Sequence, residues 1–238
     1  MNIASSGLGD VSFRLDLHNH THFSADGVQS LAELLEKAAI QGIDCLAVTD
    51  HNTVRGGLEG VALAAKNLHL PRVIPGVELN TQAGEIVGLF VSEELPSMLP
   101  VEEAVARIHA QGGLVYLPHP YDKLRRGAVN SQDRMRVAVL ADIIETLNGR
   151  SLGRRAGKKS AELAASVGKP AGAGSDAHMR SEVGAVWIRV AEMPTRENLL
   201  RLLATGQIEH NLRGSSYALN WGRMGSAPLI RLWRRIRG

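Results

Sequence analysis

The chain has 238 residues, and 44% of them are hydrophobic, enough for the core of one large or two small α/β domains. The formal net charge of +3 is mildly basic and suits anionic substrates. No apolar run is long enough to predict a membrane span, and residues 1–10 lack the basic and apolar regions of a signal peptide. The single cysteine, Cys45, excludes an intramolecular disulfide and fits a reducing compartment, so we expect a cytoplasmic protein.

The first expected element is a strand, because Phe13, Leu15 and Leu17 alternate with polar residues. It leads into the segment 16–26, which contains three histidines and two carboxylates. Side chains two apart on a strand point the same way, so His18 and His20 are placed to bind one ion. A shifted pair, His20 and His22, is the alternative, and the phase of the strand favours the first pair.

Helical and strand-like patterns then alternate along the chain. The capping box Ser30–Glu33 begins a helix that ends before Gly42. Further helices are expected over 56–68, 101–111, 131–140, 155–167 and 195–204, and further strands over 43–48, 72–77, 85–91, 114–117, 142–146, 170–174, 185–190 and 208–212. This alternation predicts a largely parallel sheet in a single domain.

Histidines and carboxylates recur at the ends of the expected strands: His18, His20, Asp26, His51, Glu78, Glu85, His119, Asp176 and His178. Residues this far apart in sequence meet only if the sheet curls, so we expect a barrel of about seven βα units rather than an open sheet. Five imidazoles and four carboxylates are too many for one ion, and the absence of thiolates favours Mn, Fe or Zn over a structural zinc site. Glu78 is placed to bridge two ions.

These residues fall into short motifs that resemble, in order, those of the polymerase and histidinol phosphatase (PHP) superfamily. The resemblance runs from Asp16 to about Val190, and five motifs in order are far more specific than any one alone. The motifs are His18-Asn-His20-Thr with Ser24-Ala-Asp26-Gly27, Thr49-Asp50-His51-Asn-Thr53, Gly76-Val-Glu78, His119-Pro120 and Gly174-Ser-Asp176-Ala-His178.

The resemblance implies a distorted (β/α)7 TIM-like barrel with two or three divalent metal ions at the C-terminal edge of its strands. It also implies the distribution of the ligands. One ion would take His18, His20, Glu78 and Asp176, a second would share Glu78 and take His119, and a third would take Asp26, His51 and His178. Many members have a histidine where this chain has Glu85, a difference that favours a harder ion such as Mn or Fe and questions equivalence with histidinol phosphatases.

Other polar residues next to the motifs have predicted roles. Asp176 and His178, with Arg125 and Arg126 on the loop after His119, are the predicted catalytic residues, and the two arginines suit phosphate oxygens. Asn148 and Arg150 follow a strand and are weaker candidates for substrate contact, and Asn148 would otherwise only close the turn. Asp16 and Asp50 are expected to orient imidazole ligands.

The expected function is a metal-dependent phosphoesterase in which a metal-bridging hydroxide attacks a phosphomonoester, either a nucleotide or a small phosphorylated metabolite. The alternatives are a nuclease-like phosphodiesterase acting on short oligonucleotides and a non-catalytic metal module of a larger assembly. An amidohydrolase-type barrel is disfavoured because no lysine ends a mid-barrel strand. Few aromatic residues accompany the basic ones, so binding of extended nucleic acid is not expected. The barrel is expected over 1–214, followed by a basic tail over 215–238 that is not a separate domain.

Overall fold

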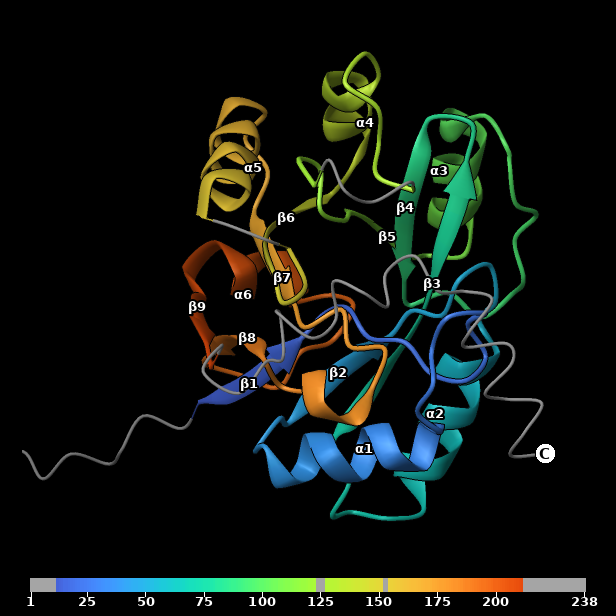
Figure 1. Ribbon diagram of the computed structural model, residues 1–238, viewed down its shortest axis with the longest axis vertical. Helices are drawn as coiled ribbons and strands as arrows, with labels where there is room; N and C mark the ends of the chain where they lie inside the picture. Colours follow the sequence, from blue (N-terminus) through green and yellow to red (C-terminus); the bar gives the residue numbers. More distant parts are fainter. Residues whose placement is uncertain (1–11, 123–126, 152–153, 212–238) are drawn as a thin grey trace, which may run out of the picture.

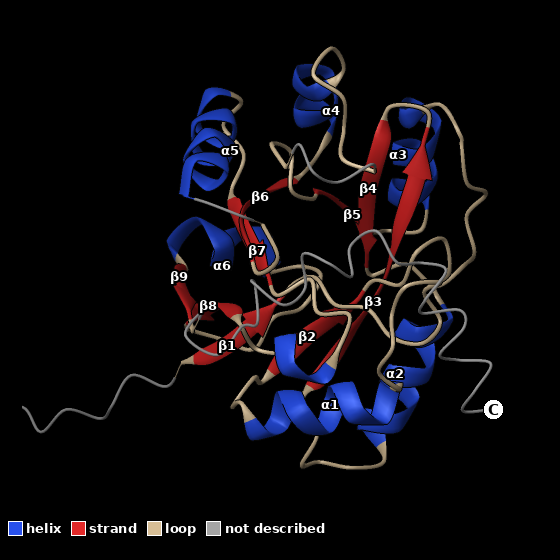
Figure 2. Cartoon of the chain, in the orientation of Figure 1, coloured by secondary structure: helices blue, strands red, loops and turns tan. Residues whose placement is uncertain are grey.

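The computed structural model describes residues 12–122, 127–151 and 154–211 (Figures 1 and 2). The described strands form one sheet in the order β7-β6-β5-β4-β3-β2-β1-β8-β9. Their bounds are β1 Phe13–Asp16, β2 Cys45–Val48, β3 Arg72–Thr81, β4 Gly84–Leu89, β5 Leu114–Leu117, β6 Ile143–Asn148, β7 Ala171–Gly174, β8 Val186–Val190 and β9 Gln207–His210. The expected order of strands along the chain is therefore confirmed, with boundaries that move by a few residues.

The helices lie on the outside of the sheet (Figure 1). They are α1 Leu31–Ile40, α2 Arg55–Ala65, α3 Val101–Ala110, α4 Arg134–Leu140, α5 Arg154–Ser166 and α6 Leu199–Thr205. The capping box at α1 is confirmed, because Ser30 Oγ accepts from the Glu33 N–H at 3.2 Å and the Glu33 carboxylate accepts from the Ser30 N–H at 2.8 Å. None of the helices in the described ranges is long and apolar enough to cross a membrane.

The sheet is mixed, so the expectation of a largely parallel sheet was wrong. The pairs β3–β4, β4–β5, β1–β8 and β8–β9 are antiparallel, and the pairs β1–β2, β2–β3, β5–β6 and β6–β7 are parallel. The antiparallel pairs on both sides of β4 arise because β3 runs on to Thr81 and the chain returns directly as β4. This hairpin has no helix between its two strands.

The sheet curls into a nearly closed barrel. Beyond β1, the Leu17 N–H donates to the carbonyl of Ala173, and the Asp176 N–H donates to the carbonyl of His18 at 2.7 Å. These bonds join the chain at the end of β1 to the chain at the end of β7. In the strand order, five strands separate β1 from β7, so the bonds close the sheet on itself. The close approach requires a glycine, because a Cβ at Gly174 would lie 2.4 Å from the Cβ of His18. The α/β barrel class is thus confirmed, while the count of seven βα units stays a prediction.

Two kinds of packing hold this shape. One apolar cluster includes Leu15, Cys45, Ile74, Val87 and Tyr116, which are fully or almost fully buried and come from five different strands. Separate clusters lie under α3, α4 and α5 and under α1. Burial on both sides of the sheet leaves one edge, where the strands end, to carry the polar motif residues.

Candidate metal centre

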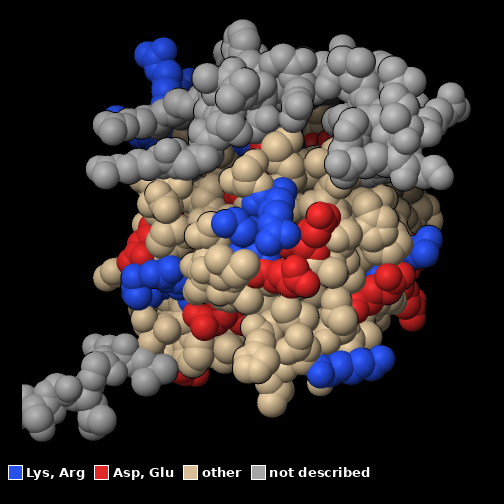
Figure 3. All heavy atoms as spheres, turned by 60° about the horizontal axis from the view of Figure 1, so that its bottom comes forward, with Lys and Arg blue, Asp and Glu red and all other residues tan. Residues whose placement is uncertain are grey.

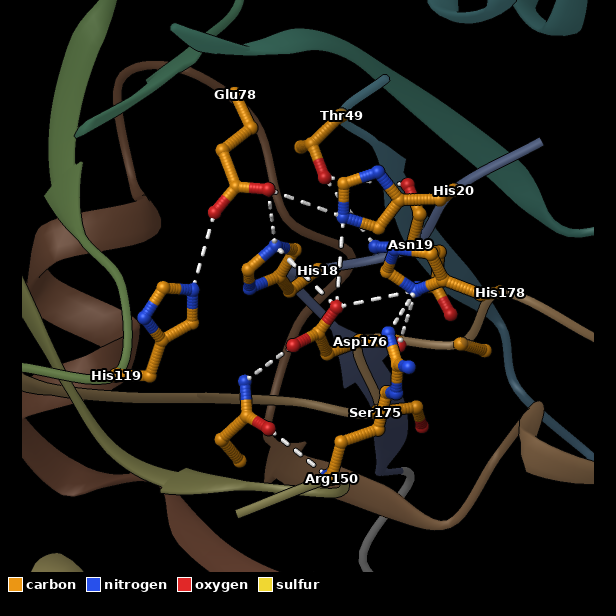
Figure 4. A network of polar contacts seen from close by, with 12 residues as sticks. His18, Asn19, His20, Thr49, Glu78, His119, Arg150, Ser175, Asp176 and His178 are labelled. Carbon is orange, nitrogen blue, oxygen red and sulfur yellow. Dashed lines mark hydrogen bonds and ion pairs between the residues drawn. The ribbon is translucent and has the colours of Figure 1, made fainter. Parts of the chain in front are cut away.

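Four of the predicted ligands converge at the edge where the barrel closes (Figure 4). His18 and His20 come from the segment after β1, Glu78 from β3, and Asp176 from the segment after β7. The strand itself ends at Asp16, so the two histidines are held in line by the closing hydrogen bonds rather than by β1. All four side chains are fully buried.

The distances within this group fit a metal ion. Glu78 Oε2 lies 3.4 Å from His18 Nε2 and 3.2 Å from His20 Nε2, and Asp176 Oδ1 lies 3.8 and 3.4 Å from the same nitrogens. Ligand atoms about 2.1 Å from a tetrahedral ion are about 3.4 Å apart. His18 Nε2, His20 Nε2 and Glu78 Oε2 are buried and make no hydrogen bond within the described part of the chain. Buried polar atoms without such partners are what an ion would satisfy.

Two further groups extend the site. Glu78 Oε1 lies 3.1 Å from His119 Nε2, and Glu85 Oε2 lies 3.8 Å from the same nitrogen. In the other group, Asp26 Oδ1 lies 3.6 Å from His51 Nε2, and Asp26 Oδ2 lies 3.1 Å from His178 Nε2. The Glu78 carboxylate therefore contacts imidazoles of more than one group, as expected of a bridging ligand.

The carboxylates of the site attract positive charge, as the pKa values of the histidines beside them show. Burial opposes protonation of His51, but Glu78, Asp26 and Glu85 outweigh it and raise its pKa to about 9. The same competition raises the pKa of His18 well above its usual value, with Asp176 and Glu78 as the largest opposing charges. The pKa of His178 is instead lowered to about 3 by burial and by the Arg150 guanidinium. A cluster that draws protons onto its imidazoles offers the same negative potential to a cation.

His20 is oriented through a serine. Its Nδ1 lies 3.1 Å from Ser24 Oγ, and Ser24 Oγ donates to Asp50 Oδ1 at 2.8 Å. Asp50 also accepts hydrogen bonds from the backbone and hydroxyl of Thr21, so it organises the whole turn. The expectation that Asp50 contacts an imidazole directly was wrong within the described structure.

The corresponding expectation for Asp16 was also wrong, because its carboxylate accepts from the backbone N–H groups of Ser175 and His18. The carboxylate that reaches the His18 ring is Glu145, whose Oε1 lies 3.3 Å from Nδ1. Sequence reasoning missed this residue. The available signal was a single carboxylate inside a strand, β6, that begins with two isoleucines and is largely buried.

Asn148 and Arg150, the weaker substrate candidates, lie beside the ligands. Asn148 Nδ2 donates to Asp176 Oδ2 at 3.0 Å, and its Oδ1 accepts the Arg150 N–H and so closes the turn. The Arg150 guanidinium lies 2.7 Å from His178 Nδ1 (Figure 4). That nitrogen is also 2.9 Å from the Asp176 carbonyl, but a guanidinium only donates hydrogen bonds, so Nδ1 accepts from Arg150 in this arrangement.

The remaining candidates lie elsewhere. His22 is exposed and packs against Phe23, and it joins none of the candidate metal groups among the described residues, so the register His18–His20 is supported over the shifted pair. His69 and His210 are exposed, and His109 pairs with Asp142 away from the site. Arg125 and Arg126, and the predicted tail over 215–238, lie outside the described residues.

Known proteins match most of this chain. The model of the PHP domain matches residues 16–147, and that of a PHP-associated region matches residues 154–208. An uncharacterized protein of Methanocaldococcus jannaschii is 30% identical over 94% of this chain and 95% of its own length. A 5′-3′ exoribonuclease of Haemophilus influenzae is 38% identical over 36% of this chain and 31% of its own length.

A solved structure shares the fold. It is a two-domain protein from Bacteroides vulgatus that contains a predicted PHP-like metal-dependent phosphoesterase, with a TM-score of 0.66 and 16% identity over 84% of this chain and 65% of that chain. The fold and the site define a metal-binding barrel of the phosphoesterase type. The chain belongs to the PHP domain family. The class predicted from its motifs, a hydrolase of phosphoric esters, is confirmed at the level of this family.

Proposed function

We propose that this protein is a phosphatase that hydrolyses a nucleotide or a small phosphorylated metabolite with two or three divalent ions, either Mn, Fe or Zn. The observation that carries the proposal is the convergence of three ligand groups on the shared carboxylate Glu78. The first group is His18, His20, Glu78 and Asp176, the second is Glu78, Glu85 and His119, and the third is Asp26, His51 and His178. When bound, such ions activate water for attack on phosphorus and neutralise the charge of the phosphate.

The chain itself supplies the fixed geometry around the reacting group. Glu78 and Asp176 are fully buried and held by a nearly closed barrel, so their oxygens cannot move apart when a charged substrate enters. The side chain of Arg150 is 19% exposed and lies beside the third group, where its guanidinium can contact phosphate oxygens. Asp26, which is 39% exposed, marks the open side of the site.

The test is hydrolysis of p-nitrophenyl phosphate and of nucleoside monophosphates by purified protein supplied with Mn²⁺, Fe²⁺ or Zn²⁺, together with a measurement of the bound metal. We expect two or three ions per chain, and we expect activity to be lost in His20→Ala and Asp176→Ala. The control is His109→Ala, because His109 lies on the surface and pairs only with Asp142 among the described residues. Wild-type protein that binds metal but cleaves none of these monoesters would contradict a phosphatase.

A phosphodiesterase acting on short oligonucleotides is the second candidate, and the local similarity to an exoribonuclease favours it. The same assay distinguishes the two with bis(p-nitrophenyl) phosphate and 5′-phosphorylated dinucleotides. On the face seen in Figure 3, basic and acidic side chains of the described residues are interspersed rather than gathered into a basic stripe. This distribution favours a short substrate over extended nucleic acid. Protein that binds divalent ions but cleaves neither monoesters nor diesters would point instead to a non-catalytic metal module.

A further inference from the structure

Glu145 is a buried carboxylate whose two oxygens contact four hydrogen-bonding groups. It lies in β6 and is 1% exposed. Its Oε1 accepts from the Tyr116 hydroxyl at 2.8 Å and lies 3.3 Å from His18 Nδ1. Its Oε2 accepts from the His119 N–H at 2.6 Å and from Asn148 Nδ2 at 3.0 Å. Burying a carboxylate costs free energy unless its oxygens are hydrogen-bonded, and here both oxygens have partners.

Three of these four contacts lead to proposed metal ligands. The first is with the ring of His18, and the second is with the backbone of His119. The third is with Asn148, whose amide also donates to Asp176 Oδ2 at 3.0 Å. One carboxylate therefore connects ligands that reach the site from the segments after β1, β5 and β7.

Two of the connected ligands have a positive φ angle, a backbone conformation that residues other than glycine adopt less often. The φ angle is +28° at His119 and +52° at Asp176. Such conformations persist only where neighbouring contacts hold them. Glu145 holds the N–H of His119 directly and holds the carboxylate of Asp176 through Asn148.

We propose that Glu145 is a positioning residue for the metal centre, and that it keeps the proton of His18 on Nδ1 so that Nε2 is free to bind an ion. This inference rests on the metal ligands proposed above. The geometry supplies the reason, since an ionised carboxylate only accepts hydrogen bonds, so the nitrogen that faces it must carry the proton. When His18 is neutral, its Nε2 then directs a lone pair to the side where Glu78 and Asp176 lie.

The variant Glu145→Gln tests this with little change of shape. Its amide NH2 group cannot replace Oε2, because that position faces the fixed backbone N–H of His119. The NH2 group therefore faces Tyr116 and His18. The tyrosine hydroxyl can rotate and accept, but His18 Nδ1 can accept only by giving up its proton to Nε2. The metal-binding nitrogen would then be blocked.

We expect Zn²⁺ binding, measured by calorimetry, to weaken about 10- to 100-fold in Glu145→Gln. The control is Asp142→Asn. Asp142 directly precedes β6 and accepts the Val115 N–H of β5 at 2.8 Å, so, like Glu145, it is a carboxylate that accepts a backbone hydrogen bond from a neighbouring segment. Its other side-chain partner among the described residues is His109, which is not a proposed ligand. The Asp142→Asn variant should change thermal stability without changing Zn²⁺ affinity more than about 2-fold.

A second measurement uses the wild-type protein, so it does not depend on the folding of a variant. Histidine ¹⁵N and ¹H spectra of the Zn²⁺-loaded protein report which ring nitrogen of His18 carries the proton. We expect the proton on Nδ1 and the metal on Nε2. Metal on Nδ1, or equal Zn²⁺ affinity in Glu145→Gln and wild type, would refute the role of Glu145. Wild-type protein that binds no Zn²⁺, Mn²⁺ or Fe²⁺ would refute the metal centre itself.

Discussion

Raising the pH of the metal-free protein from 7 to 9.5 should destabilise it, in part through His51. Its pKa is about 9 in the folded protein and 6.5 as the reference for the unfolded chain. A group with a raised folded pKa contributes stability that is fully present below pH 6.5 and is lost as the pH rises through 9. At about 1.4 kcal/mol per pH unit, the part of this shift that falls between pH 7 and 9.5 is worth roughly 2 kcal/mol. For a chain of this size that corresponds to a fall in Tm of about 4–8 °C from His51.

Between pH 7 and 9.5, some other groups with shifted pKa values make contributions to stability that do not change. Burial raises the pKa of Asp16 to about 6, so its contribution is already lost below pH 7. The pKa of His178 is lowered to about 3, so its neutral form contributes stability throughout the window. Burial raises the pKa of Cys45 from 9.0 to about 12, so its contribution to stability begins to fall only near pH 9, at the upper end of the window, and it acts in the same direction as His51. The pKa values of His18 and His20 are raised as well, so these residues act in the same direction as His51.

The assay is thermal unfolding of protein stripped with EDTA, compared with the same protein loaded with Zn²⁺. Metal binding requires neutral imidazoles, so the loaded protein should not show this loss, and its metal affinity should rise with pH. The variant His51→Gln removes one of the titrating groups and should make the fall in Tm of the stripped protein smaller, while His18 and His20 still contribute. A Tm of the stripped wild type that stays level or rises between pH 7 and 9 would refute the reasoning.

Three further variants test single contacts. Gly174→Ala places a Cβ 2.4 Å from that of His18 and should lower the free energy of unfolding by about 1–3 kcal/mol, measured with urea; an unchanged midpoint would argue against close packing at the barrel closure. Ser24→Ala removes the link between Asp50 and His20 Nδ1 and should weaken Zn²⁺ binding about 10-fold by calorimetry; unaltered affinity would show that the hydroxyl does not orient the ring. Glu85→His should shift the metal content of purified protein from Mn or Fe towards Zn, measured by mass spectrometry, whereas an unchanged ratio would exclude Glu85 as the determinant of the metal.

Much of the site was predictable because its residues lie in local motifs. His18 and His20 are two residues apart, and Asp176 and His178 repeat that spacing after the last inner strand. Each pair begins two residues after the end of a strand, so the end of the strand and the position of the ligands are visible together in one short segment. The convergence of such segments was expected only because parallel strands end at a common edge.

Glu145 shows what local patterns do not reveal. Within its own strand it is only a carboxylate between Ile144 and Thr146. Its partners Tyr116 and His119 belong to the adjacent strand and to the segment that follows that strand. Its role depends on the pairing of β5 with β6 and on the closure of the barrel near His18. The same holds for Asp50, which acts on His20 through Ser24 rather than directly.

The sequence by itself determined the order of the elements, the capping of α1, the identity of the buried strands and the motif residues. These follow from interactions between residues that are close along the chain or from a short hydrophobic period. The tertiary structure alone decided the antiparallel return of β4, the closure of 17–20 on 173–177, and which carboxylate faces His18. These depend on contacts between residues distant in sequence, and such contacts are selected by the packing of the whole barrel rather than by any local pattern.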